Sequence, residues 1–212
     1  MSDSCLSPSS NTNPLPLTRI VSWAQQLACE VLRPGDCAVD LTAGKGRDTL
    51  VLAKAVGASG QVVAFDLQSE ALTQAQAFLQ QHDFSAIRLS ETDKLPAAPG
   101  LYLVKSCHSL LQQLVTTPCR AIMANLGYFP GGDHSKITRP ETTLAALRQA
   151  LKLLLPGGRL AVTVYPAHAG GAAESDAVSS FFAGLSEEDW RVLKIAVENS
   201  VQAPYVLVVE KR

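Results

Sequence analysis

The sequence has no hydrophobic run long enough to cross a membrane, because its apolar stretches are far shorter than the roughly 20 residues that a transmembrane helix needs. It also has no positively charged start followed by an apolar segment, so we predict no signal peptide. These two absences indicate a cytoplasmic protein that does not contact the membrane.

The sequence also lacks a large net charge and clusters of metal-binding side chains. The formal net charge is −1, so we expect no overall attraction for nucleic acid, and RNA binding would need a local basic patch or a partner. Five cysteines occur without any Cys-x-x-Cys pair, and histidine and cysteine never cluster at the spacing of metal ligands. We therefore predict reduced, buried thiols and no metal site.

Strand-like and helix-like segments alternate through most of the chain. Residues 1–17 are rich in Ser, Pro and Asn without periodicity, which is typical of a disordered tail, and residues 18–212 are predicted to form a single domain. The alternation predicts an α/β, doubly wound fold with a mostly parallel sheet. Seven strands are expected, at residues 37–41, 61–65, 101–104, 120–124, 159–165, 190–197 and 205–210. The last two strands have no helix between them, which predicts an antiparallel hairpin at one edge, an ending typical of methyltransferases.

Three local details of this pattern carry separate expectations. Residues 87–89 could form a strand, but residues 101–104 are favoured as the third strand of the sheet. Thr138 and Glu141 have the spacing of a capping box, which predicts that Thr138 caps the following helix. The run 156–158, Pro-Gly-Gly, is expected to end that helix before the fifth strand.

A glycine-rich turn follows the first predicted strand. In Asp40-x-x-x-Gly44-x-Gly46 the glycines let the backbone approach a ligand closely, and the N-terminus of the next helix favours a polar or anionic group. Asp66 follows about 20 residues later, where an acid can accept both hydroxyls of a ribose. A turn without a ligand, with Asp66 as a helix cap, is the structural alternative. The predicted cofactor-binding residues are Asp40, Gly44, Gly46, Asp48, Thr49, Asp66, Gln68 and Asn125.

The turn fits NAD only in part. A dinucleotide site needs a third glycine to seat the pyrophosphate, and Thr49 stands at that position. Asp40 and Asp48 would also lie close to the pyrophosphate charge. A sulfonium cofactor has no phosphate, and its methionine ammonium group would be stabilised by a nearby carboxylate. We therefore favour S-adenosyl-L-methionine as the cofactor.

Asn125-Leu-Gly-Tyr128 follows the fourth predicted strand, where the ligand crevice of an open α/β sheet lies. It resembles the Asn/Asp-Pro-Pro-Tyr/Phe motif of amine methyltransferases. The Asn125 oxygen can accept the protons of an amine and so aim its lone pair, and Tyr128 can stack on a flat base. A plain turn, in which Asn125 caps and Tyr128 packs, is the alternative.

Several side chains near the same edge could serve the reaction or bind the substrate. His108, His134 and His168 are candidate proton acceptors, and each could equally be a hydrogen-bonded structural histidine. Lys136, Arg139 and Arg159 could supply positive charge for RNA phosphates. The predicted catalytic residues are Asn125, Tyr128, His108 and His168. The predicted substrate-binding residues are Tyr128, Gly131, Gly132, Asp133, His134, Tyr165 and His168.

The second half of the chain resembles the signature of one family. The matching runs are Asn125-Leu-Gly-Tyr-Phe-Pro-Gly-Gly-Asp-His134, Ile137-Thr138, Glu141-Thr-Thr-Leu-x-Ala-Leu147, Pro156-Gly-Gly158, and Tyr165-x-x-His-x-Gly-Gly171 with Glu174. Over residues 19–212 the chain is similar to bacterial and plastid methyltransferases once called "putative rRNA methylases", the tRNA wobble-uridine methyltransferases of the MnmM (YtqB-like) type. The resemblance implies methyl transfer to the primary amine of aminomethyl-thiouridine in the tRNA anticodon.

The chain departs from the family pattern at a few positions. Lys45 and Arg47 stand where the family tends to have Asn and His, and Ser106 and Ser109 replace two acids beside His108. Two alternatives to the tRNA hypothesis stay open. One is the same transfer to rRNA or a small-molecule amine, and the other is a non-catalytic module that binds the cofactor. A homodimer is also left open.

Overall fold

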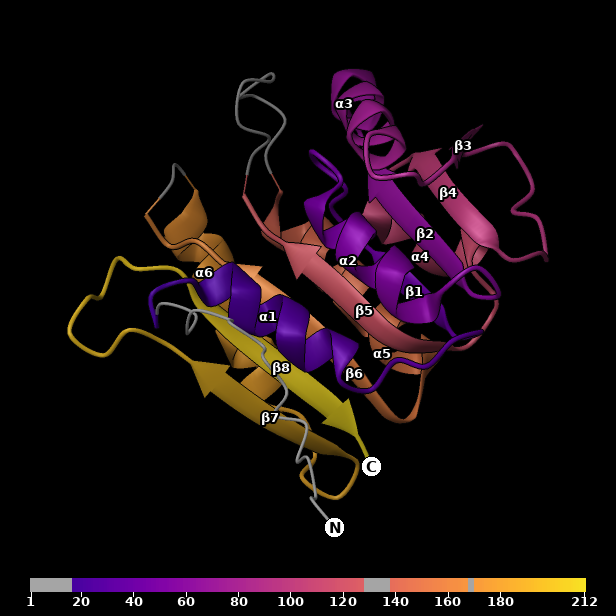
Figure 1. Ribbon diagram of the computed structural model, residues 1–212. Helices are drawn as coiled ribbons and strands as arrows, with labels where there is room; N and C mark the ends of the chain where they lie inside the picture. Colours follow the sequence, from indigo (N-terminus) through magenta and orange to yellow (C-terminus); the bar gives the residue numbers. More distant parts are fainter. Residues whose placement is uncertain (1–16, 128–137, 168–169) are drawn as a thin grey trace, which may run out of the picture.

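The chain forms one eight-stranded sheet with helices on both faces (Figure 1). The computed structural model describes residues 17–127, 138–167 and 170–212. The strands are β1 (Cys37–Asp40), β2 (Gln61–Asp66), β3 (Ala86–Ser90), β4 (Gly100–Lys105), β5 (Cys119–Asn125), β6 (Leu154–Val164), β7 (Trp190–Ile195) and β8 (Tyr205–Lys211). Their order is β3-β4-β2-β1-β5-β6-β8-β7. All pairs from β3 to β6 are parallel, and β8 pairs antiparallel with both β6 and β7. The predicted doubly wound fold and its antiparallel ending are confirmed.

The helices divide between the two faces of the sheet. They are α1 (Ile20–Cys29), α2 (Arg47–Val56), α3 (Ser69–Gln80), the 3-10 turn η1 (His108–Leu110), α4 (Leu111–Leu114), α5 (Pro140–Leu153) and α6 (Gly171–Ala183). Helices α1, α2 and α3 cover one face, and α4, α5 and α6 cover the other. In α1 the buried residues Ile20, Ala24 and Ala28 recur every four positions, which gives the helix one apolar stripe. Among the described residues, no helix is long and apolar enough to span a membrane.

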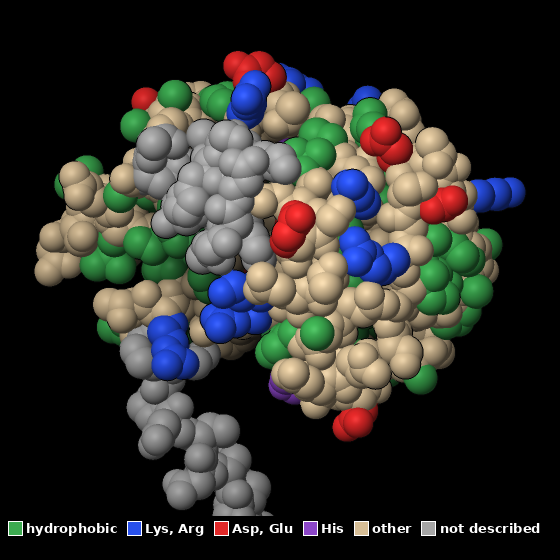
Figure 2. All heavy atoms as spheres, turned by 90° about the horizontal axis from the view of Figure 1, so that it is seen from above, with side chains coloured by type: hydrophobic (Ala, Val, Ile, Leu, Met, Phe, Trp, Pro, Cys, Tyr) green, Lys and Arg blue, Asp and Glu red, His purple; other side chains and the backbone are tan. Residues whose placement is uncertain are grey.

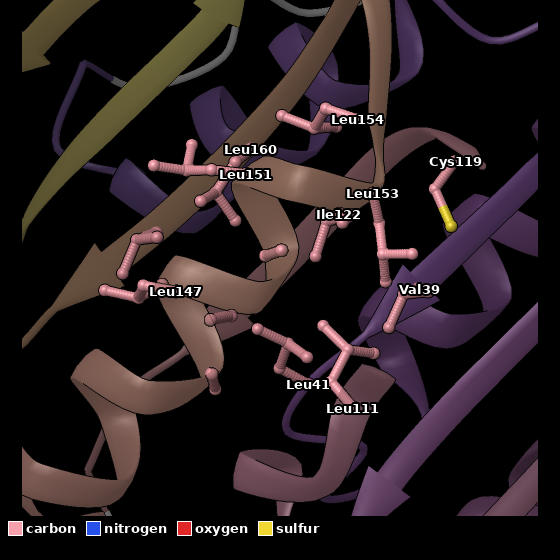
Figure 3. Close-up of a cluster of buried hydrophobic side chains, with 14 of the residues drawn as sticks. Val39, Leu41, Leu111, Cys119, Ile122, Leu147, Leu151, Leu153, Leu154 and Leu160 are labelled. Carbon is pink, nitrogen blue, oxygen red and sulfur yellow. The ribbon is translucent and has the colours of Figure 1, made fainter. Parts of the chain in front are cut away.

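Two hydrophobic cores result from this layering. Successive residues of a strand point to opposite faces, so Ala38 packs beneath α1–α3 while Val39 packs beneath α4–α6. Figure 3 shows the second core, in which Leu147 and Leu151 of α5 lie beside Ile122 and Leu160 of the sheet. The central strands are buried on both sides, which explains why they consist of short continuous apolar runs.

The sequence prediction of seven strands is one too few. Residues 86–90 form the outermost strand β3, which pairs with β4. The connection between these two strands contains no helix. The favoured stretch, residues 101–104, lies within β4, and the stretch that was not favoured, residues 87–89, lies within β3, so both are strands. An edge strand has only one neighbour, and here even Ile87 is largely exposed. The stretch therefore lacks the apolar pattern by which a buried strand is recognised.

Two expected local signals are also wrong. Helix α5 has Arg139 as its N-cap residue, without any side-chain cap, so Thr138 does not form the predicted capping box. The run 156–158 does not separate α5 from the next strand, since α5 ends at Leu153 and the run lies within β6. Pairing with β5 shifts there, and Gly158 lies so close to the carbonyls of residues 120 and 155 that a side chain would collide with them.

The carboxyl ends of the parallel strands meet at one edge, the upper edge in Figure 1. Figure 2 views the molecule from above, and on the described part of this face Lys and Arg side chains lie among Asp and Glu side chains. The described residues that directly follow β1, β2, β4, β5 and β6 lie at this edge. In open α/β sheets this is where ligands bind.

We expect Leu147→Ala to lower the free energy of unfolding by about 2–5 kcal/mol, because it leaves a cavity in the core between α5 and the sheet. Leu193→Ala on the edge strand β7, where the side chain is 51% exposed, is the matched control and should change stability by less than about 0.5 kcal/mol. Urea unfolding followed by circular dichroism measures both. Equal losses in the two variants would contradict the core described above.

Candidate functional site

The turn between β1 and α2 has a backbone conformation that requires glycine. Gly44 and Gly46 have φ angles of +50° and +78°, in the left-handed region. A Cβ atom at Gly46 would lie 3.1 Å from the Cα and Cβ atoms of Ala75 in α3, so a side chain there would push against the backbone of that helix. The glycine-rich turn predicted from the sequence is therefore present, and it packs directly on α3.

Asp66 connects this turn to the end of β2. Its Oδ2 accepts a hydrogen bond from the Gly44 N–H at 3.0 Å, and its Oδ1 accepts one from the Gln68 N–H at 2.9 Å. Helix α3 begins at Ser69 without a side-chain cap, so the alternative of Asp66 as a helix cap is not found. Burial raises the pKa of Asp66, and the backbone N–H groups oppose that rise. Each carboxylate oxygen has a second lone pair with which to accept a ligand hydroxyl.

Asp40 and Thr49 lie beneath the turn and are fully buried. The Thr49 hydroxyl donates to Asp40 Oδ2 at 2.6 Å, and the Thr42 N–H donates to Asp40 Oδ1 at 3.0 Å. Burial, reinforced by the negative charge of Asp48, raises the pKa of Asp40 to about 7. We interpret these two residues as holding the turn in place rather than touching a ligand.

Asn125 occupies the carboxyl end of β5, with its amide turned by a neighbouring carboxylate. Its Nδ2 donates to Asp48 Oδ2 at 3.4 Å, while Asp48 Oδ1 accepts from Gln25 Nε2 at 2.6 Å. Burial raises the pKa of Asp48. Asn125 Oδ1 is buried and has no hydrogen-bond partner in the described part of the chain. A buried acceptor without a donor is costly, so this oxygen is available to accept a hydrogen bond from a group outside the described residues.

Tyr165 follows β6 and borders the same group of side chains. Burial and the charge of Asp48 raise the pKa of Tyr165, and a hydrogen bond with Asn125 opposes the rise. The structure thus brings together Asp48, Asn125 and Tyr165, which the sequence predicts as site residues. It adds Gln25 from α1, which sequence reasoning missed. A single glutamine on an amphipathic helix carries no signal that distinguishes it from an ordinary solvent-facing residue.

His108 contacts the first strand rather than an open cavity. Its Nδ1 lies 3.2 Å from the Leu41 carbonyl oxygen, which can only accept, so Nδ1 carries the proton and Nε2 has a free lone pair. Nε2 is buried without a partner in the described residues, and burial lowers the pKa of this histidine. The imidazole is therefore neutral at physiological pH. A narrow gap beside it is lined mainly by apolar side chains of the sheet and α5.

A hollow of about 340 Å³ lies next to Asp66, at the ends of three neighbouring strands. Its lining residues are Leu67, Ser90, Glu91, Thr92, Lys105 and Ser106. Three of these residues come from the end of β3 and the residues that follow it. The edge strand that sequence reasoning missed therefore forms one wall of the hollow.

Part of the predicted site cannot be placed. The predicted residues that lie outside the described ranges are Tyr128, Gly131, Gly132, Asp133, His134 and His168, together with Lys136. Arg159, which the sequence analysis names with Lys136 and Arg139 as a source of positive charge, lies at the start of the parallel run of β6, and its guanidinium binds Glu30 and Glu210 at 2.9 and 2.7 Å. No group of three or more metal-ligating side chains occurs within the described residues.

Known proteins resemble this chain over most of its length. The family model "Putative rRNA methylase" matches residues 62–211, and a model of protein-L-isoaspartate(D-aspartate) O-methyltransferase matches residues 13–96. The "tRNA (mnm(5)s(2)U34)-methyltransferase, chloroplastic" of Arabidopsis thaliana is 36% identical over 199 residues, which cover 91% of this chain and 67% of that protein.

Two solved structures resemble both the sequence and the fold. A Clostridium thermocellum protein described as a "putative rRNA-methylase" has a TM-score of 0.81 and 31% identity, with 91% of this chain and 97% of that chain covered. A Streptococcus mutans protein described as a "putative methyltransferase", crystallised with SAH, has a TM-score of 0.76 and 32% identity, with 92% and 98% covered.

Asp40 should make stability depend on pH. Its pKa rises from an ordinary value of 3.8 to about 7, so between these values the folded state binds a proton that the unfolded chain has released. The free energy of unfolding should therefore fall as the pH rises through this window. In Asp40→Asn the free energy of unfolding should fall less steeply with pH, and the remaining fall is due to Asp48 and Asp66. The control Asp189→Asn, at an exposed position, should leave the pH dependence as in wild type. Urea unfolding across the window measures this, and parallel curves for wild type and Asp40→Asn would refute it.

Proposed function

The chain belongs to the family described as "Putative rRNA methylase", and we propose that it uses S-adenosyl-L-methionine to methylate an amine on a tRNA wobble uridine. The observation that carries this proposal is the buried, unpartnered Asn125 Oδ1 beside the Asp66 and glycine-turn site. The proposed substrate is 5-aminomethyl-(2-thio)uridine, which would become the methylaminomethyl form. The name of the Arabidopsis relative supports this choice.

The residues at the carboxyl edge fit an adenosine cofactor. Asp66 would accept the ribose hydroxyls, since its two oxygens are already oriented by backbone N–H groups. The turn at Gly44 and Gly46 would lie against the cofactor with backbone alone, and Gln68 and Asp48 would flank it. The hollow bordered by Leu67 and Ser106 would take the flat base. When bound, the cofactor supplies a methyl group on a sulfonium sulfur.

Asn125 would orient the nitrogen that receives the methyl group. A carboxylate cannot donate a hydrogen bond, so Asp48 must face the NH₂ side of the Asn125 amide. The amide oxygen then points away from Asp48 and is free to accept an amine N–H, which would aim the lone pair along the line of transfer. Gln25 holds Asp48 from the opposite side. Desolvation in this buried site would lower the pKa of the amine and favour its neutral, nucleophilic form.

His108 would accept the proton that the amine releases during methyl transfer. A neutral imidazole with a free Nε2 lone pair is a suitable proton acceptor. Tyr128, Gly131, Gly132, Asp133, His134, Tyr165 and His168 are proposed to contact the tRNA anticodon stem-loop. The cytoplasmic location and a homodimer are likewise proposals.

The test of this function is methylation of purified RNA, followed by mass spectrometry of its nucleosides. With S-adenosyl-L-methionine, the purified protein should convert aminomethyl-thiouridine to the methylaminomethyl form in tRNA from a strain that lacks this gene. Product on rRNA or on small amines instead would move the proposal to another acceptor. Binding of S-adenosylhomocysteine without product on any acceptor would indicate a non-catalytic module.

Asp66→Asn should weaken the binding of S-adenosylhomocysteine by roughly 10- to 100-fold, since hydrogen bonds to a charged group contribute about 1.5–3 kcal/mol. Isothermal titration calorimetry gives the dissociation constant directly. Asp189→Asn, at an exposed position away from the edge, carries the same chemical change and should bind as tightly as wild type. Unchanged binding by Asp66→Asn would remove Asp66 from the cofactor site.

Asn125→Ala should lower kcat on tRNA by roughly 100- to 1,000-fold, the effect seen when one positioned hydrogen-bonding group is removed from an active site. Asn199→Ala makes the same change on an exposed loop and should retain full activity. Timed nucleoside analysis measures both variants. Full turnover by Asn125→Ala would show that another group orients the amine.

A further inference from the structure

The chain that leaves β5 is fixed at three successive backbone N–H groups. The Asn125 N–H donates to Thr42 Oγ1 at 2.7 Å, and the Leu126 N–H donates to the Thr163 carbonyl at 2.9 Å. The Gly127 N–H donates to Thr138 Oγ1 at 2.9 Å. The position of Asn125 therefore depends on hydroxyl groups from other parts of the chain.

Gly127 and Thr138 form a reciprocal pair. The Thr138 N–H donates back to the Gly127 carbonyl oxygen at 2.9 Å. Gly127 has a φ angle of +129°, which a side chain would strain, so this residue type suits the sharp departure from the strand. Thr138 thus contacts the segment that carries Asn125 through both its backbone and its side chain.

Glu174 in the first turn of α6 determines which way these hydrogen bonds run. It is 1% exposed, and it accepts from Thr138 Oγ1 at 2.6 Å and from Thr143 Oγ1 at 2.7 Å. A carboxylate only accepts, so the Thr138 hydroxyl must donate to it, and the lone pairs of Thr138 Oγ1 are left to receive the Gly127 N–H. The positive ends of the α5 and α6 dipoles favour a carboxylate at this place.

We propose that Glu174, acting through Thr138, is a positioning residue for methyl transfer, which holds Gly127 and thereby sets the place of the Asn125 amide. The inference rests on the proposed function. Glu174 touches neither cofactor nor acceptor; it joins the chain leaving β5 to the helix that follows β6. A displacement of reacting groups by about 1 Å can cost roughly 100-fold in rate, so even a small release of Gly127 should be measurable.

The decisive variant is Thr138→Val, which keeps the shape of the side chain and removes its hydroxyl. Thr142→Val is the matched control, because Thr142 is a half-buried residue of the same region whose hydroxyl, among the described residues, donates to the Arg139 carbonyl. Thr138→Ser restores the hydroxyl, and Glu174→Gln tests the carboxylate by replacing one acceptor oxygen with a donor. All variants are made in the full-length protein.

Two properties, kcat and the exchange rate of the Gly127 amide, report on positioning, and S-adenosylhomocysteine binding reports on folding. Kinetics on tRNA should show kcat lowered roughly tenfold or more in Thr138→Val and Glu174→Gln. The stoichiometry and affinity of S-adenosylhomocysteine binding should stay unchanged. Hydrogen exchange of ¹⁵N-labelled protein should show faster exchange of the Gly127 amide in the same two variants. Thr138→Ser should recover both properties, and Thr142→Val should match wild type in both.

The possible results are distinguishable. Wild-type kcat in Thr138→Val, an equal loss in Thr142→Val, or a parallel loss of S-adenosylhomocysteine binding would each overturn the positioning role. If wild-type protein has no activity on tRNA, the proposed function fails. The exchange rate of the Gly127 amide then decides whether Glu174 and Thr138 hold this segment.

Discussion

Carboxylates at the carboxyl edge of the sheet orient the polar groups around them, because a carboxylate can accept hydrogen bonds but cannot donate them. Asp66 aligns the Gly44 backbone. Asp48 fixes the amide of Asn125, and Glu174 fixes the Thr138 hydroxyl. Each acid comes from a different place in the sequence, yet each settles the direction of a neighbouring donor. The site is therefore defined by the directions of hydrogen bonds as much as by the positions of atoms.

This arrangement carries an energetic cost that the cores offset. Burial raises the pKa values of Asp40, Asp48 and Asp66, which means that keeping them ionised opposes folding near neutral pH. Asn125 Oδ1 and His108 Nε2, which have no hydrogen-bond partner among the residues that the structure describes, add a further cost. A protein accepts such costs where pre-arranged groups serve a ligand, and the two apolar cores on either side of the sheet provide the compensating stability.

The sequence could predict what depends on local pattern. The central strands, the glycine turn and the end of β5 are read from short apolar runs and from Gly44, Gly46 and Asn125. The edge strand β3 is absent from the seven predicted strands because an exposed strand lacks such a run. Thr138 was misread because Thr-x-x-Glu looks the same whether its hydroxyl bonds the next helix or a glutamate 36 positions away. Gln25 could not be found at all, since its role depends on the distant Asp48.

The outermost position of β3 has a consequence for how the binding face is built. β3 hydrogen-bonds to β4 alone, whereas β1 and β2 lie between neighbours on both sides. The residues that end β3 form one wall of the hollow beside Asp66, while Asn125, whose amide we propose faces the acceptor, belongs to β5 at the centre of the sheet. Insertions or replacements in residues 86–99 can thus reshape the space for a bound base without moving the central strands. Ligand preference can therefore change at the edge strand β3, while the central strands, where the chemistry would take place, keep their positions.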